Sequence, residues 1–162
     1  MSAFFPLPPL FSVESYRMDD SVGYLLARSR AMLAKALDAA LAAERVTHAQ
    51  SGILLLLASG KYLTAADLVR ETYIDAASMT RMLDRLQRNG LIERLPHADD
   101  RRQMRLSLTD AGAALAQRLP AIMVGVLNAR FAGFSPEEIG FLKSLLRKLL
   151  QTGGMADAAD NA

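Results

Sequence analysis

Two short segments of the sequence have the alternating pattern of β-strands. The apolar residues elsewhere in the chain recur at the spacing of helices. The segments are residues 91–95 and 104–108, and in the second Met104, Leu106 and Leu108 alternate with polar side chains. Apolar side chains at every second position are typical of a strand with one buried face. The polar stretch between the two segments predicts a hairpin tip. We therefore expect a mostly α fold with one small β hairpin.

Capping residues and apolar spacing divide the remainder into six expected helices. Thr47, Thr64, Asp75, Thr109 and Ser135 each stand just before a helical run, and side chains of this kind cap helix N-termini. The expected helices run from about Asp20 to Glu44, from Thr47 to Ser59-Gly60, from Ala65 to Glu71, from Asp75 to Asn89, from Thr109 to roughly Gly133 with a bend at Pro120, and from Ser135 through Leu149.

Composition excludes several kinds of chemistry. The 162 residues contain no cysteine, so a disulfide scaffold, a thiolate zinc site and a cysteine nucleophile are ruled out. His48 and His97 lie on different expected elements without metal-ligand spacing, and no glycine-rich phosphate loop is present. We therefore expect no metal, no cofactor and no enzymatic activity.

The N-terminal residues do not predict a targeting segment. The apolar stretch from Met1 to Phe11 is broken by Pro6, Pro8 and Pro9 and lacks the cationic start of a signal peptide. No segment is long enough to cross a membrane. Together with the absence of cysteine, this predicts a cytoplasmic protein with no membrane partner, whose N-terminus forms an extended arm.

The order of elements from residue 64 to residue 108 indicates DNA binding. A short helix, a turn, a cationic helix, a strand, a basic hairpin and a strand follow one another, as in a winged helix-turn-helix. From Ala76 to Arg105, seven arginines stand against four acidic residues, whereas the whole chain has a net charge of only +2. These arginines could form an ordinary solvated helix face, but two adjacent arginines in the hairpin favour DNA as the partner.

Three segments carry a resemblance to a known family. They are Ile74 to Leu86, then Asn89 to Arg94, and then Asp99-Asp100-Arg101-Arg102 leading into Leu106 to Gly112. In this order they resemble the recognition helix and wing of the MarR (multiple antibiotic resistance regulator) family of transcription regulators. The wing with its Asp-Arg-Arg and the following Leu-Thr-x-x-Gly is the most specific part, and the resemblance covers about residues 21–151.

The resemblance implies a homodimer whose two winged lobes read a pseudo-palindromic operator in double-stranded DNA. The expected parts are an arm (1–19), a helical dimerisation region (20–45 and 109–151), a winged helix-turn-helix lobe (46–108) and a disordered tail (152–162). The apolar stripes of the first and last helices independently favour a partner chain, because one small lobe could not cover them.

The resemblance also implies which residues contact DNA. On the recognition helix, the side chains expected to face bases and phosphates are Ala76, Ala77, Ser78, Thr80, Arg81 and Arg85. Arg101 and Arg102 are expected at the wing tip, with Asp100 orienting one of them through an ion pair. Thr64 and nearby backbone amides are expected to hold a phosphate. Ala77 stands where the family often has Ser or Thr, so a thymine methyl contact suits it.

Family members commonly release DNA when a small phenolic or aromatic carboxylate binds where the dimer helices meet the lobes. Many relatives carry a bulky aromatic after the position of Gln50, whereas this chain has Ser51-Gly52, which leaves room for a ligand. The residues expected around that space are Tyr24, Arg28, Ser29, His48 and Ser51. Arg28 or His48 would meet the carboxylate of the effector.

Other interpretations remain open at this point. Arg28 can be a solvated surface cation, His48 a residue of a capping turn and Ser29 a helix serine bonded to its own backbone. The protein is expected to be a ligand-responsive repressor. The alternative is a helical protein-interaction adaptor that uses a winged domain without binding DNA, and an adaptor would not need Arg101 and Arg102.

Overall fold

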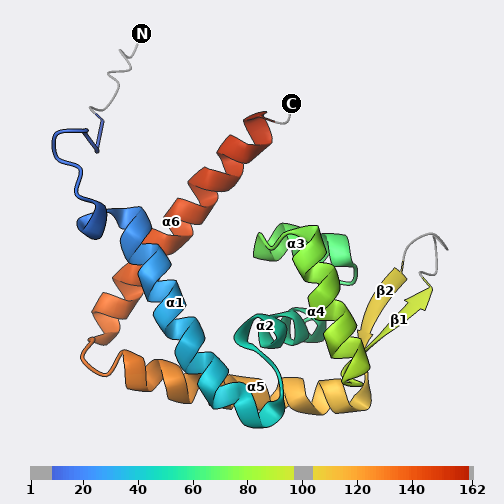
Figure 1. Cartoon of the computed structure of the whole chain (residues 1–162). Helices are drawn as coiled ribbons and strands as arrows, with labels where there is room; N and C mark the ends of the chain where they lie inside the picture. Colours follow the sequence, from blue (N-terminus) through green and yellow to red (C-terminus); the bar gives the residue numbers. More distant parts are fainter. Residues whose placement is uncertain (1–8, 97–103, 161–162) are drawn as a thin grey trace. The chain divides into compact units, whose positions relative to one another are not determined.

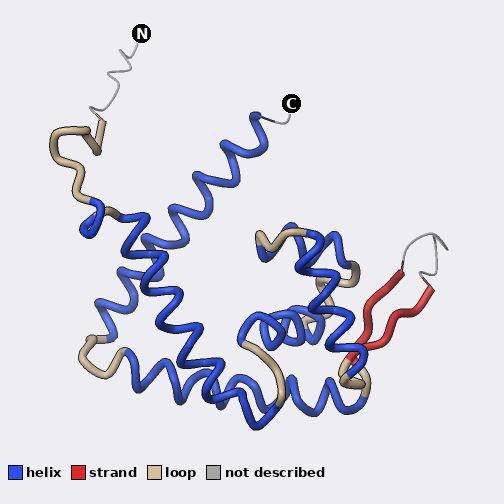
Figure 2. The backbone as a smooth tube through the Cα atoms, in the orientation of Figure 1, coloured by secondary structure: helices blue, strands red, loops and turns tan. Residues whose placement is uncertain are grey.

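The computed structural model describes residues 9–96 and 104–160, which form helices and two strands (Figures 1 and 2). In chain order the elements are η1 Met18–Asp20, α1 Val22–Leu41, η2 Ala42–Glu44, α2 His48–Ala58, α3 Ala65–Thr72, α4 Ala76–Arg88, β1 Ile92–Pro96, β2 Met104–Leu108, α5 Asp110–Arg130 and α6 Pro136–Asp160. The mostly α fold with a small β hairpin is therefore confirmed.

The helices begin at the capping residues that the sequence predicts. Thr47 and Gln50 form a reciprocal capping box at α2, with N–O distances of 3.0 and 3.2 Å. Ser135 and Glu138 do the same at α6, at 2.7 and 3.2 Å. These bonds satisfy amides that the first turn of a helix cannot pair internally. Helix α1 starts slightly later than predicted, because Ser21 is its cap.

The chain forms two compact units, residues 1–126 and residues 127–162, which are described separately. The predicted domain bounds stay a prediction, and helix α1 and most of α5 belong to the same unit as the winged lobe. The physical reason is packing: Leu37 and Leu41 of α1 and Leu115 and Leu119 of α5 are buried in the core of the lobe. The role of residues 20–45 and 109–151 in dimerisation stays a prediction.

One hydrophobic core holds the first unit together. Its fully buried side chains come from α1, α2, α3, α4, β1 and α5; they are Leu41, Ile53, Leu54, Leu68, Met79, Leu83, Leu86, Ile92 and Leu119. Burial of each such side chain contributes about 1.5–3 kcal/mol relative to an exposed position. The core therefore fixes α4 and the start of the hairpin on one scaffold.

The two strands pair antiparallel, from Ile92 opposite Leu108 to Pro96 opposite Met104. Leu106 on β2 also donates its backbone N–H to the carbonyl oxygen of Leu63, at 2.7 Å. This bond ties the hairpin to the residues just before α3. The hairpin is thus anchored to the helical part of the lobe at its base.

The motif Leu-Thr-x-x-Gly joins the hairpin to α5. Thr109 accepts a hydrogen bond from the Gly112 N–H at 3.1 Å and donates its hydroxyl proton to the Gly90 carbonyl at 2.6 Å. A Cβ added at Gly112 would lie 1.9 Å from the carbonyl oxygen of Leu91. Only glycine allows α5 to pass this close to the turn that precedes β1.

The second unit contains the last turn of α5 and all of α6. Phe131 and Phe134 pack edge to face in the connection, with ring centroids 5.2 Å apart. Helix α6 continues to Asp160, whereas the sequence predicts a disordered tail over residues 152–162. Alanine is the strongest helix former, and the alanines after Gly153-Gly154 offset the low helix propensity of the two glycines.

Across the described residues, no helix combines the length and apolar character that membrane crossing requires.

Candidate DNA-binding surface

Helix α4 has one buried face and one exposed face. Met79, Leu83 and Leu86 are buried in the core, with at most 1% of each residue exposed. On the opposite side the exposed residues are Ala76, Ala77, Thr80, Arg81, Arg85 and Arg88. Ser78 is partly buried at the edge of this face. All six residues that sequence analysis assigns to DNA contact from this helix therefore lie outside the core, and short or cationic side chains can approach a groove.

Asp75 fixes the start of α4. Its side chain accepts a hydrogen bond from the Ser78 N–H at 2.8 Å. This bond is the main reason that the pKa of Asp75 lies below its ordinary value, with the Ser78 hydroxyl and the charge of Arg81 adding to it. Within the next turn, Thr80 donates its hydroxyl proton to the Ala76 carbonyl at 2.9 Å. The first turn of α4 is thus held by its own polar side chains.

Arg81 is oriented by a neighbour on the same helix. Its guanidinium donates to the Ser78 hydroxyl oxygen at 2.8 Å. Ser78, Arg81, Met82 and Arg85 line a shallow, open depression on the outer surface of α4. A guanidinium has five N–H donors, so the bond to Ser78 leaves others for a phosphate or a base edge.

Arg94 connects the wing to α4. From β1, its guanidinium donates to Asp84 Oδ1 at 2.7 Å and to Gln87 Oε1 at 2.7 Å. Sequence analysis counts Arg94 in the basic cluster but assigns it no role. Alternation along the strand predicts the face of the hairpin on which Arg94 lies. It does not predict the residues of α4 that Arg94 contacts, because these depend on how the hairpin packs on that helix.

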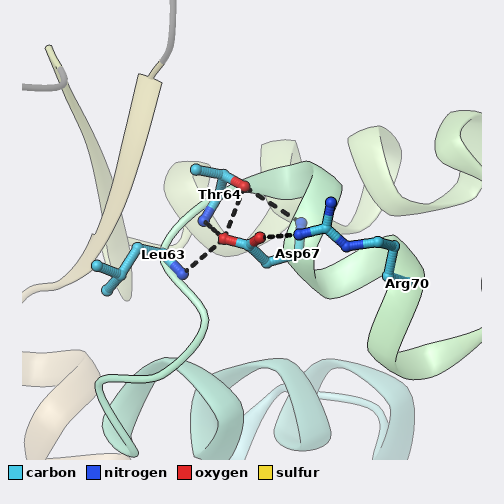
Figure 3. Close-up of polar contacts among 4 residues, drawn as sticks. All are labelled: Leu63, Thr64, Asp67 and Arg70. Carbon is cyan, nitrogen blue, oxygen red and sulfur yellow. Dashed lines mark hydrogen bonds and ion pairs between the residues drawn. The ribbon is translucent and has the colours of Figure 1, made fainter. Parts of the chain in front are cut away.

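Thr64, which the sequence predicts to hold a phosphate, caps the start of α3. Figure 3 shows the Asp67 carboxylate at the N-terminus of α3, where it accepts bonds from the N–H groups of Leu63 and Thr64 and from the Thr64 hydroxyl, at 3.3, 3.0 and 2.8 Å. Asp67 also forms an ion pair with Arg70. The Thr64 N–H and hydroxyl proton are therefore already bonded to a carboxylate of the protein.

The hydroxyl of Thr64 is the main cause of the low pKa of Asp67, to which the two amides and Arg70 contribute. Asp67 is therefore charged near neutral pH. A fixed negative charge beside the Leu63 and Thr64 amides disfavours a phosphate at those two groups, and the phosphate contact at this helix start stays a prediction.

The predicted wing-tip residues Asp100, Arg101 and Arg102 lie outside the described residues. The described strands end at Pro96 and Met104, which pair with each other on either side of that segment. Arg105, the next residue of β2, is exposed. The described part of the hairpin thus carries an exposed cation at Arg105.

The five predicted ligand residues do not form one site in the chain. Tyr24 and Arg28 pair on α1, with 2.8 Å between the guanidinium and the phenol oxygen, and Ser29 beside them is exposed. The His48 N–H instead bonds to Asp38, at 2.6 Å. Asp38 lies ten residues beyond Arg28 on the same helix, a rise of about 15 Å. The structure thus brings Tyr24 and Arg28 together on α1, and a ligand site that also includes His48 stays a prediction.

Ser51 is fully buried and donates its hydroxyl proton to the His48 carbonyl at 2.7 Å, so its polar group is already paired within α2. Space does exist beside it, because a Cβ added at Gly52 would meet nothing within 4 Å. Among the described residues, no group of three or more His, Asp or Glu side chains is placed to hold a metal ion.

Comparison with known proteins gives a consistent result. The model of the MarR family matches residues 46–103. The multiple antibiotic resistance protein MarR of Escherichia coli (strain K12) is 31% identical over 106 residues, which cover 65% of this chain and 74% of MarR. The organic hydroperoxide resistance transcriptional regulator of Bacillus subtilis (strain 168) is 30% identical over 139 residues, or 84% of this chain and 91% of that protein.

Solved structures agree with this result. A mutant MarR from E. coli complexed with operator DNA matches with a TM-score of 0.73 and 26% identity, covering 84% of this chain and 99% of that chain. Bordetella bronchiseptica BpsR, whose DNA binding is regulated by 6-hydroxynicotinic acid, also has a TM-score of 0.73 and 26% identity, with coverage of 83% and 96%.

Proposed function

The chain belongs to the MarR family of transcriptional regulators, and on that premise we propose that it binds a pseudo-palindromic DNA operator as a homodimer. In this proposal α4 enters the major groove, and the wing lies along the neighbouring minor groove. In this proposal the protein acts as a repressor, whose bound dimer blocks transcription from a promoter that overlaps the operator. A small aromatic or phenolic acid releases it from DNA.

The exposed face of α4 is the observation that carries this proposal. It combines small residues at its start with Arg81 and Arg85 one helical turn apart, on a helix whose other face is locked into the core. Small residues permit close approach to base edges, and arginines can donate two hydrogen bonds to a guanine or a phosphate. No enzyme chemistry is needed to explain this surface.

Dimer formation is supported by apolar side chains that remain exposed on α1 and, separately, on α6. Leu25 and Met32 on α1 are 47% and 48% exposed, and Phe141 and Leu145 on α6 are 70% and 65% exposed. Surfaces of this kind mark sites of association in stable proteins. A two-fold dimer would repeat the lobe at a spacing that two half-sites can match.

The decisive experiment measures DNA binding directly. A duplex is first selected from a random-sequence library by the wild-type protein, and its affinity is then compared with that of a scrambled duplex by fluorescence anisotropy. We expect the selected duplex to bind about 10³-fold or more tightly. Affinity should fall steeply as salt rises, because phosphate contacts release counterions. Equal, weak binding of both duplexes would instead favour the protein-interaction adaptor.

The effector proposal rests on the pair formed by Tyr24 and Arg28. Its phenol and guanidinium lie together on α1 and offer donors for a carboxylate. Benzoate and 6-hydroxynicotinic acid are suitable probes, and binding should raise the Tm of the wild type but not that of Arg28→Ala. If neither probe changes the Tm or the operator affinity of the wild type, this part of the proposal is wrong.

A further inference from the structure

Asp84 is the single acidic residue of α4, and it lies on the side that faces away from the core. It follows Arg81 by three positions and precedes Arg88 by four, and residues at these spacings share one helix face. Its side chain is 48% exposed. An unpaired carboxylate here would repel the phosphates on either side of a groove that α4 enters.

Arg94 compensates this charge from the wing. Its two guanidinium nitrogens donate to Asp84 Oδ1 and to Gln87 Oε1, each at 2.7 Å, and its own side chain is only 29% exposed. Both distances are short, as expected for charge-assisted bonds. A planar guanidinium can reach two acceptors at once, which a lysine ammonium on a flexible stem does less well.

The same contacts join the two elements that the proposed function assigns to DNA. Asp84 and Gln87 belong to α4, whereas Arg94 belongs to β1, on the far side of the turn at Gly90, where φ is +69°. Backbone bonds from Gly90 to Gln87 and from Leu91 to Leu86, at 2.9 and 3.0 Å, hold the turn itself, and Arg94 adds side-chain bonds farther along β1. These side-chain bonds restrict the angle between α4 and β1.

From this geometry we propose that Arg94 is a positioning residue for DNA binding, an inference that rests on the proposed function. It neutralises Asp84 and sets the wing against α4, and it does so without touching DNA itself. We call the set Arg94, Asp84 and Gln87 the Arg94 bridge. The bridge explains how an acidic residue is tolerated on the exposed face of the recognition helix.

The test is a double-mutant cycle at Arg94 and Asp84, read out as affinity for the duplex that the wild type selects. Arg94→Ala leaves the carboxylate unpaired, so affinity should fall about 10-fold. Asp84→Ala added to Arg94→Ala removes the unpaired charge and should recover about 3-fold of that loss, whereas the rest stays lost because the wing is no longer held against α4. If the double variant binds as weakly as Arg94→Ala alone, the proposal is overturned.

Salt dependence separates positioning from direct contact with DNA. In the double variant, the slope of log affinity against log salt should equal that of the wild type. If Arg94 itself contacted a phosphate, the slope would be shallower by about 0.9 for each protomer. A shallower slope would therefore also overturn the proposal.

Two further variants control for folding and for loss of an ion pair in general. Arg118→Ala breaks a comparable ion pair, from α5 to Glu44 at 2.8 Å, and should leave operator affinity unchanged. Arg94→Lys keeps the charge and should lie between the wild type and Arg94→Ala, with an unchanged circular dichroism spectrum. If the wild type binds no duplex, the proposed function fails. If the wild type binds and Arg94→Ala binds equally well, only the bridge fails.

Discussion

At the scale of single residues, Gly112 marks the closest approach of α5 to the rest of the lobe. A methyl group there would meet the Leu91 carbonyl oxygen at 1.9 Å, and that oxygen also accepts the Thr109 N–H. Neither backbone can move without disturbing the base of the wing. We expect Gly112→Ala to lower the free energy of unfolding by about 1–3 kcal/mol or more, measured by urea denaturation at fixed protomer concentration.

Gly125→Ala is the matched control, because it adds the same methyl group to the same helix. A Cβ at Gly125 meets nothing within 4 Å. Alanine there should raise the free energy of unfolding by about 0.5–1 kcal/mol, since glycine is the poorer helix former. Equal effects at the two positions would show that helix propensity, and not the contact with Leu91, decides the outcome.

The Asp67 carboxylate gives stability a pH dependence that can be assigned to one group. Its pKa in the folded protein lies below the ordinary value of 3.8, chiefly because the Thr64 hydroxyl donates to the charged form. Stability from this group is therefore present above pH 3.8 and is lost as pH falls through the lowered pKa of the folded state. We expect the Tm of Asp67→Asn to fall less than that of the wild type between about pH 5 and about pH 2.5.

A parallel decline in the Tm of the two proteins over that range would show that Asp67 does not contribute through its charge. Urea denaturation near neutral pH serves as a second measurement. There the wild type should be the more stable protein, because the neutral amide that Asp67→Asn introduces accepts weaker hydrogen bonds from Thr64 and Leu63.

Sequence alone predicts the exposure of some candidate site residues but not the bonds that others make, for a definite physical reason. The exposed face of α4 is predictable, because Met79, Leu83 and Leu86 share one buried face and its arginines therefore lie on the other. The start of α3 is less predictable, because a helix start offers amides to any anion, and sequence does not tell that Asp67 already accepts bonds from the Thr64 N–H and hydroxyl. Asp67, three residues on, is the signal that points to the capping box.

At the scale of elements, α4 carries in Arg81 a hydrogen-bond donor whose side chain is already oriented. The bond to Ser78 orients the guanidinium, and Met82 and Arg85 flank it around the shallow depression. We expect Arg81→Ala to cost about 1–3 kcal/mol of operator affinity and to relax specificity at one base pair of each half-site. Binding to a panel of singly substituted duplexes, measured by anisotropy, would show both effects.

Arg30→Ala is a suitable comparison for this variant, because it removes an exposed arginine from α1 instead of α4. Its operator affinity should match that of the wild type. Uniform weakening of Arg81→Ala on all duplexes, with the base preferences kept, would assign Arg81 to a phosphate and contradict the prediction of base contact.

The bounds of the elements follow closely from capping residues. Thr47, Asp75 and Ser135 each pair with the amide three residues later, so a short sequence pattern decides where the chain turns into a helix. The end of α6 lacks such a signal. A Gly-Gly pair predicts a stop, but the alanines beyond it favour continuation, and α6 extends to Asp160.

At the scale of the whole molecule, sequence reasoning fails where it must place distant residues in space. The predicted effector site combines residues of α1 and α2 whose side chains are small or polar, and the sequence does not give the distances between them. Periodicity places Arg28 and Asp38 on one helix but does not say that His48 packs beside Asp38, at the far end from Arg28. The division into units escapes prediction for the same reason, since Leu37 and Leu115 join the lobe core through contacts between separate elements.

In the proposed function, operator binding depends on the association of two copies. Helix α6 carries Phe141, Leu145, Leu149 and Leu150, each at least half exposed. We expect Leu145→Glu to convert a dimer into a folded monomer, because a carboxylate cannot be buried unpaired in an apolar interface. Sedimentation equilibrium would give the mass, and circular dichroism would show that the helices remain.

The monomer should also bind the selected duplex about 10²-fold or more weakly, because one lobe no longer raises the local concentration of the other at the second half-site. Leu95→Glu, the same change at a 40% exposed leucine of β1, should keep the dimer mass. A dimeric Leu145→Glu protein would remove α6 from the interface. A monomeric wild type that still binds a pseudo-palindrome with full affinity would mean that each lobe reads DNA alone.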